Sequence, residues 1–292
     1  MSSSINRSVP QRRPATRETI RAIVANAQPG GRFPGVELPP NWFQAPVERL
    51  TVGSVLPEAG DREGIVEAVH RMSADIRDAG LDAFRKGLHP ILVGGCHALA
   101  MGSMAAATTH QGRTAVIWVD AHADFNTPDT SPSGNPHGMP LAVACGLGDE
   151  RLTRLFSHAL NPSDLIIIGA RAIDPLEKKL LEQQGVWHVS VPQLREMGIP
   201  AMVSAIAERF AELPVHLSFD FDSISAEYFI ATGTPVANGL TPDEAEALLQ
   251  GLAASDLAIK SSDWVEFDPS HDKAEECGAL SRRMFEAMYG RM

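Results

Sequence analysis

The sequence has few cysteines and no excess of positive charge, and these deficits exclude several classes of protein. Its 292 residues include three cysteines without a CxxC spacing, so neither a disulfide framework nor a zinc ribbon is expected. The formal net charge is −11 and no basic stripe with interleaved aromatic residues occurs, which argues against a nucleic-acid partner. We therefore expect an ordinary globular protein of the reducing cytoplasm.

Long apolar runs are also absent from the sequence. No run could span a bilayer, and no charged region followed by an apolar core opens the chain, so we expect neither a membrane partner nor secretion. Arginine and serine are frequent over residues 1–21, as in transit peptides, but we interpret this segment as a tail; glycine and proline are frequent over 28–46. We predict a disordered or irregular segment over 1–46 and a single domain over 47–292.

Short apolar runs alternate with stretches of helical periodicity along the rest of the chain. Helices are predicted over 62–85, near 98–108, from residue 175, over 202–212, over 242–253 behind Thr241 as N-cap, and at the C-terminus. Strands are predicted over 91–93, 115–119, 165–168, 186–189, 215–219 and 264–267. Because the strands are continuous apolar runs separated by helices, we expect an α/β fold of three α-β-α layers with a mostly parallel central sheet.

Three short polar segments each follow one of the predicted strands. They read Gly94-Gly95-Cys96-His97, Asp120-Ala121-His122-Ala123-Asp124 and Asp220-Phe221-Asp222. The carboxyl ends of parallel strands meet at one edge of a sheet, where ligands bind. Alternate residues of an extended chain point the same way, so we expect Asp120, His122 and Asp124 to converge, and likewise Asp220 and Asp222.

These side chains have the composition of a metal site. Any one of them alone would be explained by a solvated turn after a strand, but clustered carboxylates repel one another unless cations neutralise them. Two imidazoles and four carboxylates suit manganese, magnesium, iron or zinc, and four negative charges match two divalent cations. The sequence therefore predicts a site for two metal ions.

The three motifs resemble the signatures of the ureohydrolase superfamily of arginases, agmatinases and formiminoglutamases, which read approximately Gly-Gly-Asp-His, Asp-Ala-His-x-Asp and Ser-Phe-Asp-x-Asp. The loop over 126–140 resembles the arginase branch, and the similarity spans roughly Pro90 to the C-terminus. The resemblance implies an arginase-like fold, a homo-oligomer such as a trimer or hexamer, and two Mn²⁺ ions per chain. One ion would be held by His97, Asp120, Asp124 and Asp220, and the other by Asp120, His122, Asp220 and Asp222.

The same resemblance implies roles for polar residues around these ligands. Catalysis is assigned to His137, Glu266 and Asp124, with Glu266 receiving the guanidinium group and His137 serving as proton shuttle. Binding of the amino-acid head group and the substrate is assigned to Asn126, Ser133, Asn135, Asp174, Glu177 and Thr234. The implied partner is a small guanidino compound, and the implied reaction is hydrolysis of L-arginine to L-ornithine and urea by a metal-bridging hydroxide.

Three departures from the family signatures leave alternatives open. Cys96 stands where aspartate is usual, Ser225-Ala226 replaces Asp-Pro, and Ala172 occupies a commonly acidic position. The alternatives are an amidinohydrolase for N-hydroxy-L-arginine, agmatine or a guanidino acid, and a non-catalytic paralogue. Agmatine is the least favoured of these substrates, because it lacks the carboxylate that the 126–140 loop would bind.

Overall fold

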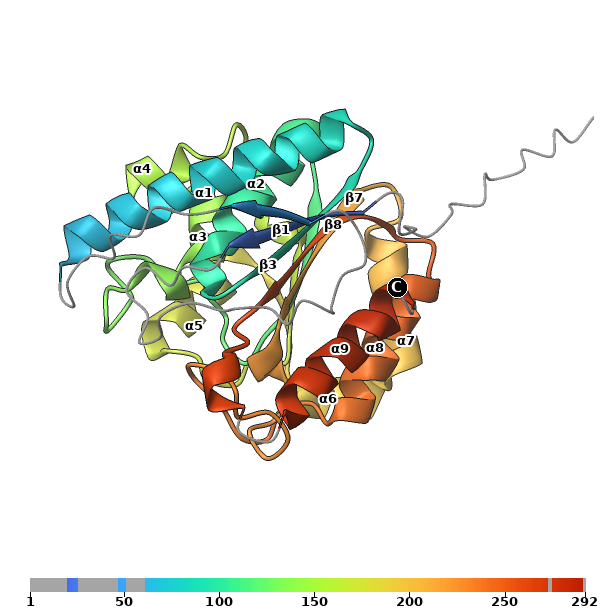
Figure 1. Cartoon of the computed structure of the whole chain (residues 1–292). Coiled ribbons are helices and arrows are strands. Elements are labelled where there is room, and N and C mark those ends of the chain that lie inside the picture. Colours follow the sequence, from blue (N-terminus) through green and yellow to red (C-terminus); the bar gives the residue numbers. More distant parts are fainter. Residues whose placement is uncertain (1–19, 26–46, 51–60, 273–274, 291–292) are drawn as a thin grey trace, which may run out of the picture.

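Strands of one central sheet form at the apolar runs of the chain. The computed structural model describes residues 20–25, 47–50, 61–272 and 275–290 (Figure 1). These residues build an eight-stranded sheet in which every pairing is parallel. Its order across the sheet is β2 (Val47–Leu50), β1 (Ile20–Ala25), β3 (His89–Gly94), β8 (Ala258–Val265), β7 (Pro214–Asp220), β4 (Ala115–Val119), β5 (Leu165–Ile168) and β6 (Trp187–Val189).

Helices cover both faces of this sheet, which confirms the predicted three-layer fold (Figure 1). One layer contains α1 (Arg62–Arg85), α2 (Ala100–Gln111), α3 (Pro140–Ala144), α4 (Glu150–Thr153) and α5 (Pro175–Gln184). The other contains α6 (Val191–Met197), α7 (Ile199–Arg209), α8 (Pro242–Ala254) and α9 (Glu276–Tyr289). Short 3-10 helices occur at η1 (His97–Leu99), η2 (Pro136–Gly138), η3 (Pro162–Asp164), η4 (Phe221–Ser223) and η5 (Pro269–His271). Within the described ranges, no helix is both long and apolar enough to cross a membrane.

The central strands are buried, as expected for a parallel sheet that is covered by helices on both faces. Every residue of β4 and β5 is buried, as the uninterrupted apolar runs predicted. The predicted N-cap at Thr241 is confirmed, because its hydroxyl accepts from the Glu244 N–H at 3.2 Å while the Glu244 carboxylate accepts from the Thr241 N–H at 2.8 Å. Helix 62–85 is also found where it was predicted.

Three strands differ from the sequence-based expectation, because neither β1 nor β2 was predicted and β8 has other bounds. Residues Ile20–Ala25 form β1 between β2 and β3, so the expected irregular segment over 1–46 is wrong for these six residues. The rest of that segment lies outside the described residues, and the boundary at residue 47 stays a prediction. Strand β8 spans Ala258–Val265, whereas the prediction placed it over 264–267. The prediction missed the start of the strand because buried polar residues interrupt its apolar pattern. Ser261 Oγ and Asp263 Oδ2 lie 2.7 and 2.8 Å from the ring nitrogens of His216 on β7.

The strand order places the three motifs side by side. Strands β3, β8, β7 and β4 are consecutive neighbours, and their carboxyl ends lie at one edge because all pairings are parallel. The segment with His97 follows β3, the segment with Asp120 follows β4, and Asp220 ends β7. Residues far apart in the chain therefore meet at the centre of this edge.

Candidate metal centre and adjoining cavity

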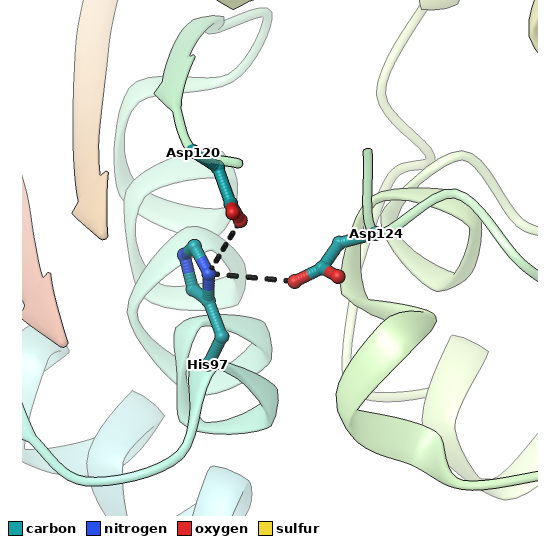
Figure 2. Close-up of side chains that lie close together, drawn as sticks. All are labelled: His97, Asp120 and Asp124. Atoms are coloured by element: carbon teal, nitrogen blue, oxygen red, sulfur yellow. Dashed lines mark ion pairs between the residues drawn. The ribbon is translucent and has the colours of Figure 1, made fainter. Parts of the chain in front are cut away.

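The Nδ1 atom of His97 is surrounded by carboxylates. It lies 2.9 Å from Asp120 Oδ2, 3.4 Å from Asp124 Oδ2 and 3.0 Å from Asp220 Oδ2. Asp120 and Asp124 approach the imidazole from two sides, one from the end of β4 and the other from the segment beyond it (Figure 2). This buried nitrogen has no hydrogen-bond partner among the described residues, as expected of an atom that offers its lone pair to a cation.

A second group of donors forms around His122. Its Nδ1 atom lies 3.0 Å from Asp222 Oδ2 and 3.5 Å from Asp120 Oδ1. The two oxygens of Asp120 thus face different histidines, so that this carboxylate belongs to both groups. The His122 side chain is 28% exposed, whereas that of His97 is 3% exposed, so the second histidine is the more accessible to solvent.

The donors converge as expected, but the backbone reason given for it is wrong. Asp124 has a positive φ of 49°, and Asp222 lies in the 3-10 helix η4 rather than in an extended strand. Turns bring the carboxylates together instead. Asp120 Oδ1 accepts from the His122 N–H at 2.7 Å, and Asp220 Oδ1 accepts from the Asp222 N–H at 2.7 Å.

Burial makes it unfavourable for all the carboxylates of this cluster to be ionised in the absence of cations. Burial, with the nearby charge of Asp120, raises the pKa of Asp124 well above its usual range, and burial with the charge of Asp222 does the same for the pKa of Asp220. Burial also opposes ionisation of Asp120, but the adjacent imidazoles of His122 and His97 outweigh it and lower the pKa of that carboxyl. Divalent ions would remove this repulsion, and the oxygen and imidazole donors suit such ions. The residues present therefore fit a divalent metal centre.

Two further side chains hold these donors in place, and the sequence analysis missed both. The Trp118 indole N–H donates to Asp120 Oδ2 at 2.9 Å, and its ring stacks on His97 with centroids 3.8 Å apart. Ser218 Oγ lies 2.8 Å from His97 Nε2. Each precedes an aspartate of its motif by two residues on a strand, so the alternation of side chains could have placed both beside the metal centre.

A cavity of about 140 Å³ opens beside the donors. It is lined by His97, His122, Asp124, Asn126, Ser131, Ser133, His137, Gly138, Ala172, Asp174, Glu177, Asp220, Asp222, Thr234 and Glu266. The structure thus brings nearly all predicted site residues to one cavity. Asp120 and Asn135 do not line it, whereas Ser131, Gly138 and Ala172 line it without having been predicted as site residues.

Glu266 and His137 face the cavity from different elements. Glu266 follows β8 with a positive φ of 62°, and its Oε1 accepts from the His97 N–H at 3.0 Å. Burial and the nearby charge of Asp222 raise the pKa of Glu266 to about 7. His137 is half-buried in η2, where Asn135 Oδ1 accepts from its backbone N–H at 3.3 Å. Burial and the neighbouring His122 lower the pKa of His137, which favours its neutral imidazole.

Hydrogen bonds also connect other polar side chains of the cavity lining. Asn126 Nδ2 donates to Asp174 Oδ2 at 3.0 Å, and Ser133 Oγ lies 3.3 Å from Ser131 Oγ. Thr234 Oγ1 donates to Asp222 Oδ2 at 3.2 Å. Glu177 is engaged by the backbone, because its oxygens accept from the Phe125 N–H at 2.9 Å and the Asp174 N–H at 3.1 Å. Such contacts make Glu177 a support for the loop as well as a wall of the cavity.

The three departures from the signatures lie in different places. Cys96 is buried and does not line the cavity. Ser225 contacts Glu227 and does not line it either. Ala172 does line the cavity, two residues before Asp174. Only this last departure therefore changes the cavity lining directly.

Comparison with known proteins gives consistent results. The model of the arginase family matches residues 32–289, further toward the N-terminus than the resemblance from Pro90. The arginase of Bacillus caldovelox is 32% identical over 240 residues, 80% of each chain, and that of Entamoeba histolytica is 35% identical over 205 residues, 69% of each chain. A crystal structure of the Entamoeba histolytica arginase in complex with L-ornithine superposes with a TM-score of 0.87 at 27% identity, covering 95% of this chain and 100% of that one.

Proposed function

This chain belongs to the arginase family, a family of ureohydrolases, and on that premise we propose that it hydrolyses L-arginine to L-ornithine and urea. One observation carries the proposal. A single cavity is lined both by the His and Asp donors and by the polar loop residues that would bind an amino-acid head group. The bound L-ornithine of the similar Entamoeba histolytica arginase structure is the expected product, which supports the choice of substrate.

We propose that two Mn²⁺ ions occupy the centre. His97, Asp120, Asp124 and Asp220 would hold one ion, and Asp120, His122, Asp220 and Asp222 would hold the other. The short distances from His97 Nδ1 and His122 Nδ1 to these carboxylates support the assignment. Bound divalent ions would lower the pKa of water to near neutrality and so supply a hydroxide nucleophile.

Glu266 orients the guanidinium group in this proposal. A carboxylate can accept two parallel N–H bonds from the planar cation, which fixes the plane of the group. The His97 N–H already holds Oε1 at 3.0 Å, so the carboxylate has a fixed direction before substrate arrives. Its positive φ of 62° is a strained conformation of the kind found at functional sites.

His137 moves the proton that the leaving amine requires. Its neutral imidazole accepts a proton released during attack and returns it to the nitrogen that departs as the amine of ornithine. A lowered pKa keeps this imidazole ready to accept. Its place on the cavity lining supports the role.

The polar loop selects the amino-acid end of the substrate. Asn126, Ser133 and Asn135 would bind the α-carboxylate, with Asp174 at the α-amino group and Glu177 supporting that end. A site built to hydrogen-bond a group rejects an analogue that lacks the group more strongly than an apolar pocket senses a methylene. Thr234, through its contact with Asp222, would border the reacting end.

Specificity constants for matched substrates test this proposal. Manganese-loaded protein is given L-arginine, N-hydroxy-L-arginine, agmatine, and the guanidino acid that lacks the α-amino group. We expect L-arginine to have the highest kcat/KM and agmatine the lowest. Because Cys96, beside the predicted ligand His97, stands where aspartate is usual, N-hydroxy-L-arginine is the second candidate. Its cleavage with L-arginine inert would replace the proposed substrate, and no turnover with two ions bound would favour a non-catalytic paralogue.

We also propose a homo-oligomer, a trimer or hexamer, in the cytoplasm. Membership of the arginase family supports the assembly, and the low cysteine content supports the compartment. Light scattering of the purified protein would test the assembly, and a monomer at all concentrations would refute it.

A further inference from the structure

The Arg171 side chain joins three segments behind the metal centre. Its Nη2 donates to the Asp222 carbonyl at 3.0 Å and to the Val236 carbonyl at 2.7 Å, and its Nε donates to the Ala237 carbonyl at 2.8 Å. Nη1 contacts the Gly169 and Ser223 carbonyls at 3.2 and 3.4 Å. A planar guanidinium with five donors is the side chain that can serve so many carbonyls at once.

The Arg171 backbone is hydrogen-bonded to the segment that carries Asp120 and His122. Its N–H donates to the Ala121 carbonyl at 2.8 Å, and the following N–H of Ala172 donates to the same oxygen at 3.0 Å. Ala121 lies between Asp120 and His122, and its own N–H donates to Asp222 Oδ1 at 3.1 Å. One residue therefore contacts both chain segments that supply the second donor group, Asp120, His122 and Asp222.

The same side chain docks the loop over 232–238. Val236 and Ala237 are held by the guanidinium, while Thr234 of this loop reaches Asp222 Oδ2 at 3.2 Å. Gly239 leaves the room that the guanidinium occupies, because a Cβ there would lie 2.4 Å from Arg171 Nη2 and 2.5 Å from the Ser223 carbonyl. The loop sequence and the arginine thus fit each other sterically.

The arginine also adds a positive charge close to the carboxylates. Burial lowers the pKa of Arg171, but the charges of Asp222, Asp120 and Asp220 act in the opposite direction. A guanidinium stays charged in proteins. The guanidinium contacts the backbone carbonyl of Asp222, whereas the side-chain oxygen Oδ2 of Asp222 faces His122, so the arginine can favour the ionised aspartates without being a metal ligand.

We propose that Arg171 is a positioning residue for the second metal ion. It holds Asp120, His122 and Asp222 in their relative arrangement and docks the 232–238 loop against them. The inference rests on the proposed function for its metal centre and concerns a residue outside the predicted ligand and substrate sets. Lysine cannot replace it fully, because an ammonium donates from one point and cannot bridge Asp222, Val236 and Ala237 together.

The test compares metal binding by the full-length wild type with that by Arg171→Met and Arg171→Lys. Arg195→Met is the matched control, since Arg195 donates at 3.1 Å to the carbonyl of Gly239, the residue directly after the same loop, but pairs with Glu244 rather than contacting Asp222. Bound manganese is measured by elemental analysis after equilibrium dialysis over a range of free Mn²⁺. Electron paramagnetic resonance distinguishes a spin-coupled pair from an isolated ion.

We expect wild type and Arg195→Met to bind two ions with the coupled signal. Arg171→Met should bind its second ion about 10- to 100-fold more weakly, the usual cost of losing support for metal ligands, and should show an isolated ion at limiting manganese. Arg171→Lys should fall between the two. Combining Arg171→Met with His122→Asn should weaken binding no further than His122→Asn alone, because both act on the same ion.

Different results would refute the role of Arg171 and the proposed function. Two tightly bound, coupled ions in Arg171→Met would overturn the inference, as would equal weakening of both ions. If the methionine variant does not fold, as judged by circular dichroism, the lysine variant decides by the same criteria. A wild type that binds two ions but leaves every guanidino substrate intact refutes the proposed function and leaves the inference standing. A wild type with fewer than two ions would refute both.

Discussion

Glu266→Gln should separate guanidinium binding from metal binding. Glutamine keeps the shape of the side chain and an oxygen that can accept from the His97 N–H, now 3.0 Å from Glu266 Oε1. It removes the negative charge that would face the substrate cation in the cavity. Breaking one partner of a covered ion pair costs about 3–5 kcal/mol. At about 1.4 kcal/mol per factor of ten, kcat/KM for L-arginine should fall roughly 100- to 4,000-fold.

Steady-state kinetics with manganese-loaded enzyme measure this effect, and elemental analysis should find two ions in the variant as in wild type. Asp268→Asn is the matched control. Asp268 is a buried acid two residues further on, its Oδ1 accepts from the Ser270 N–H at 2.9 Å, and it does not line the cavity. Its kcat/KM should stay close to that of wild type. A loss below about tenfold in Glu266→Gln would refute the assigned role, since one hydrogen bond to a charged group already contributes about 1.5 kcal/mol.

Three further predictions concern the other roles. His137→Ala should retain both ions while kcat falls by about 10²- to 10⁴-fold, the usual contribution of a proton-transfer group, and metal loss equal to that of His97→Ala would contradict a proton-shuttle role. Ser133→Ala should lower kcat/KM for L-arginine by roughly 10- to 100-fold, equivalent to one hydrogen bond to a carboxylate, and leave agmatine hydrolysis unchanged; an equal loss on agmatine would show a purely structural effect. Removing metal with a chelator should lower the thermal unfolding temperature, because ions at 100 times their Kd stabilise the folded state by about 2.7 kcal/mol per site, and an unchanged temperature would argue against bound ions.

Much of the fold could be predicted because its strands are buried on both faces. Buried strands such as Leu165–Ile168 read as uninterrupted apolar runs, and the helices Pro175–Gln184 and Pro242–Ala254 each begin with a proline behind a capping box. The strand Ala258–Val265 was predicted too short, because its buried Ser261 and Asp263 find their partner, His216, on a neighbouring strand. A local pattern cannot reveal a partner 45 residues away.

The candidate site was likewise predicted only in part. Donor residues at strand ends could be found from the sequence, since the topology of a parallel sheet brings all such ends to one edge. The backbone conformation of these donors could not be predicted, because the positive φ of Asp124 belongs to a turn rather than to an extended strand. Arg171 was missed because its partners are carbonyls of Asp222, Val236 and Ala237, and backbone carbonyls carry no sequence signal.

The most direct test of the central claim is product analysis with L-arginine and manganese-loaded protein, before and after removal of the metal. The account predicts L-ornithine and urea in equal amounts, loss of both products on chelation, and recovery of both when Mn²⁺ is returned. Protein that holds two ions in this cavity and releases neither product from L-arginine would contradict the account.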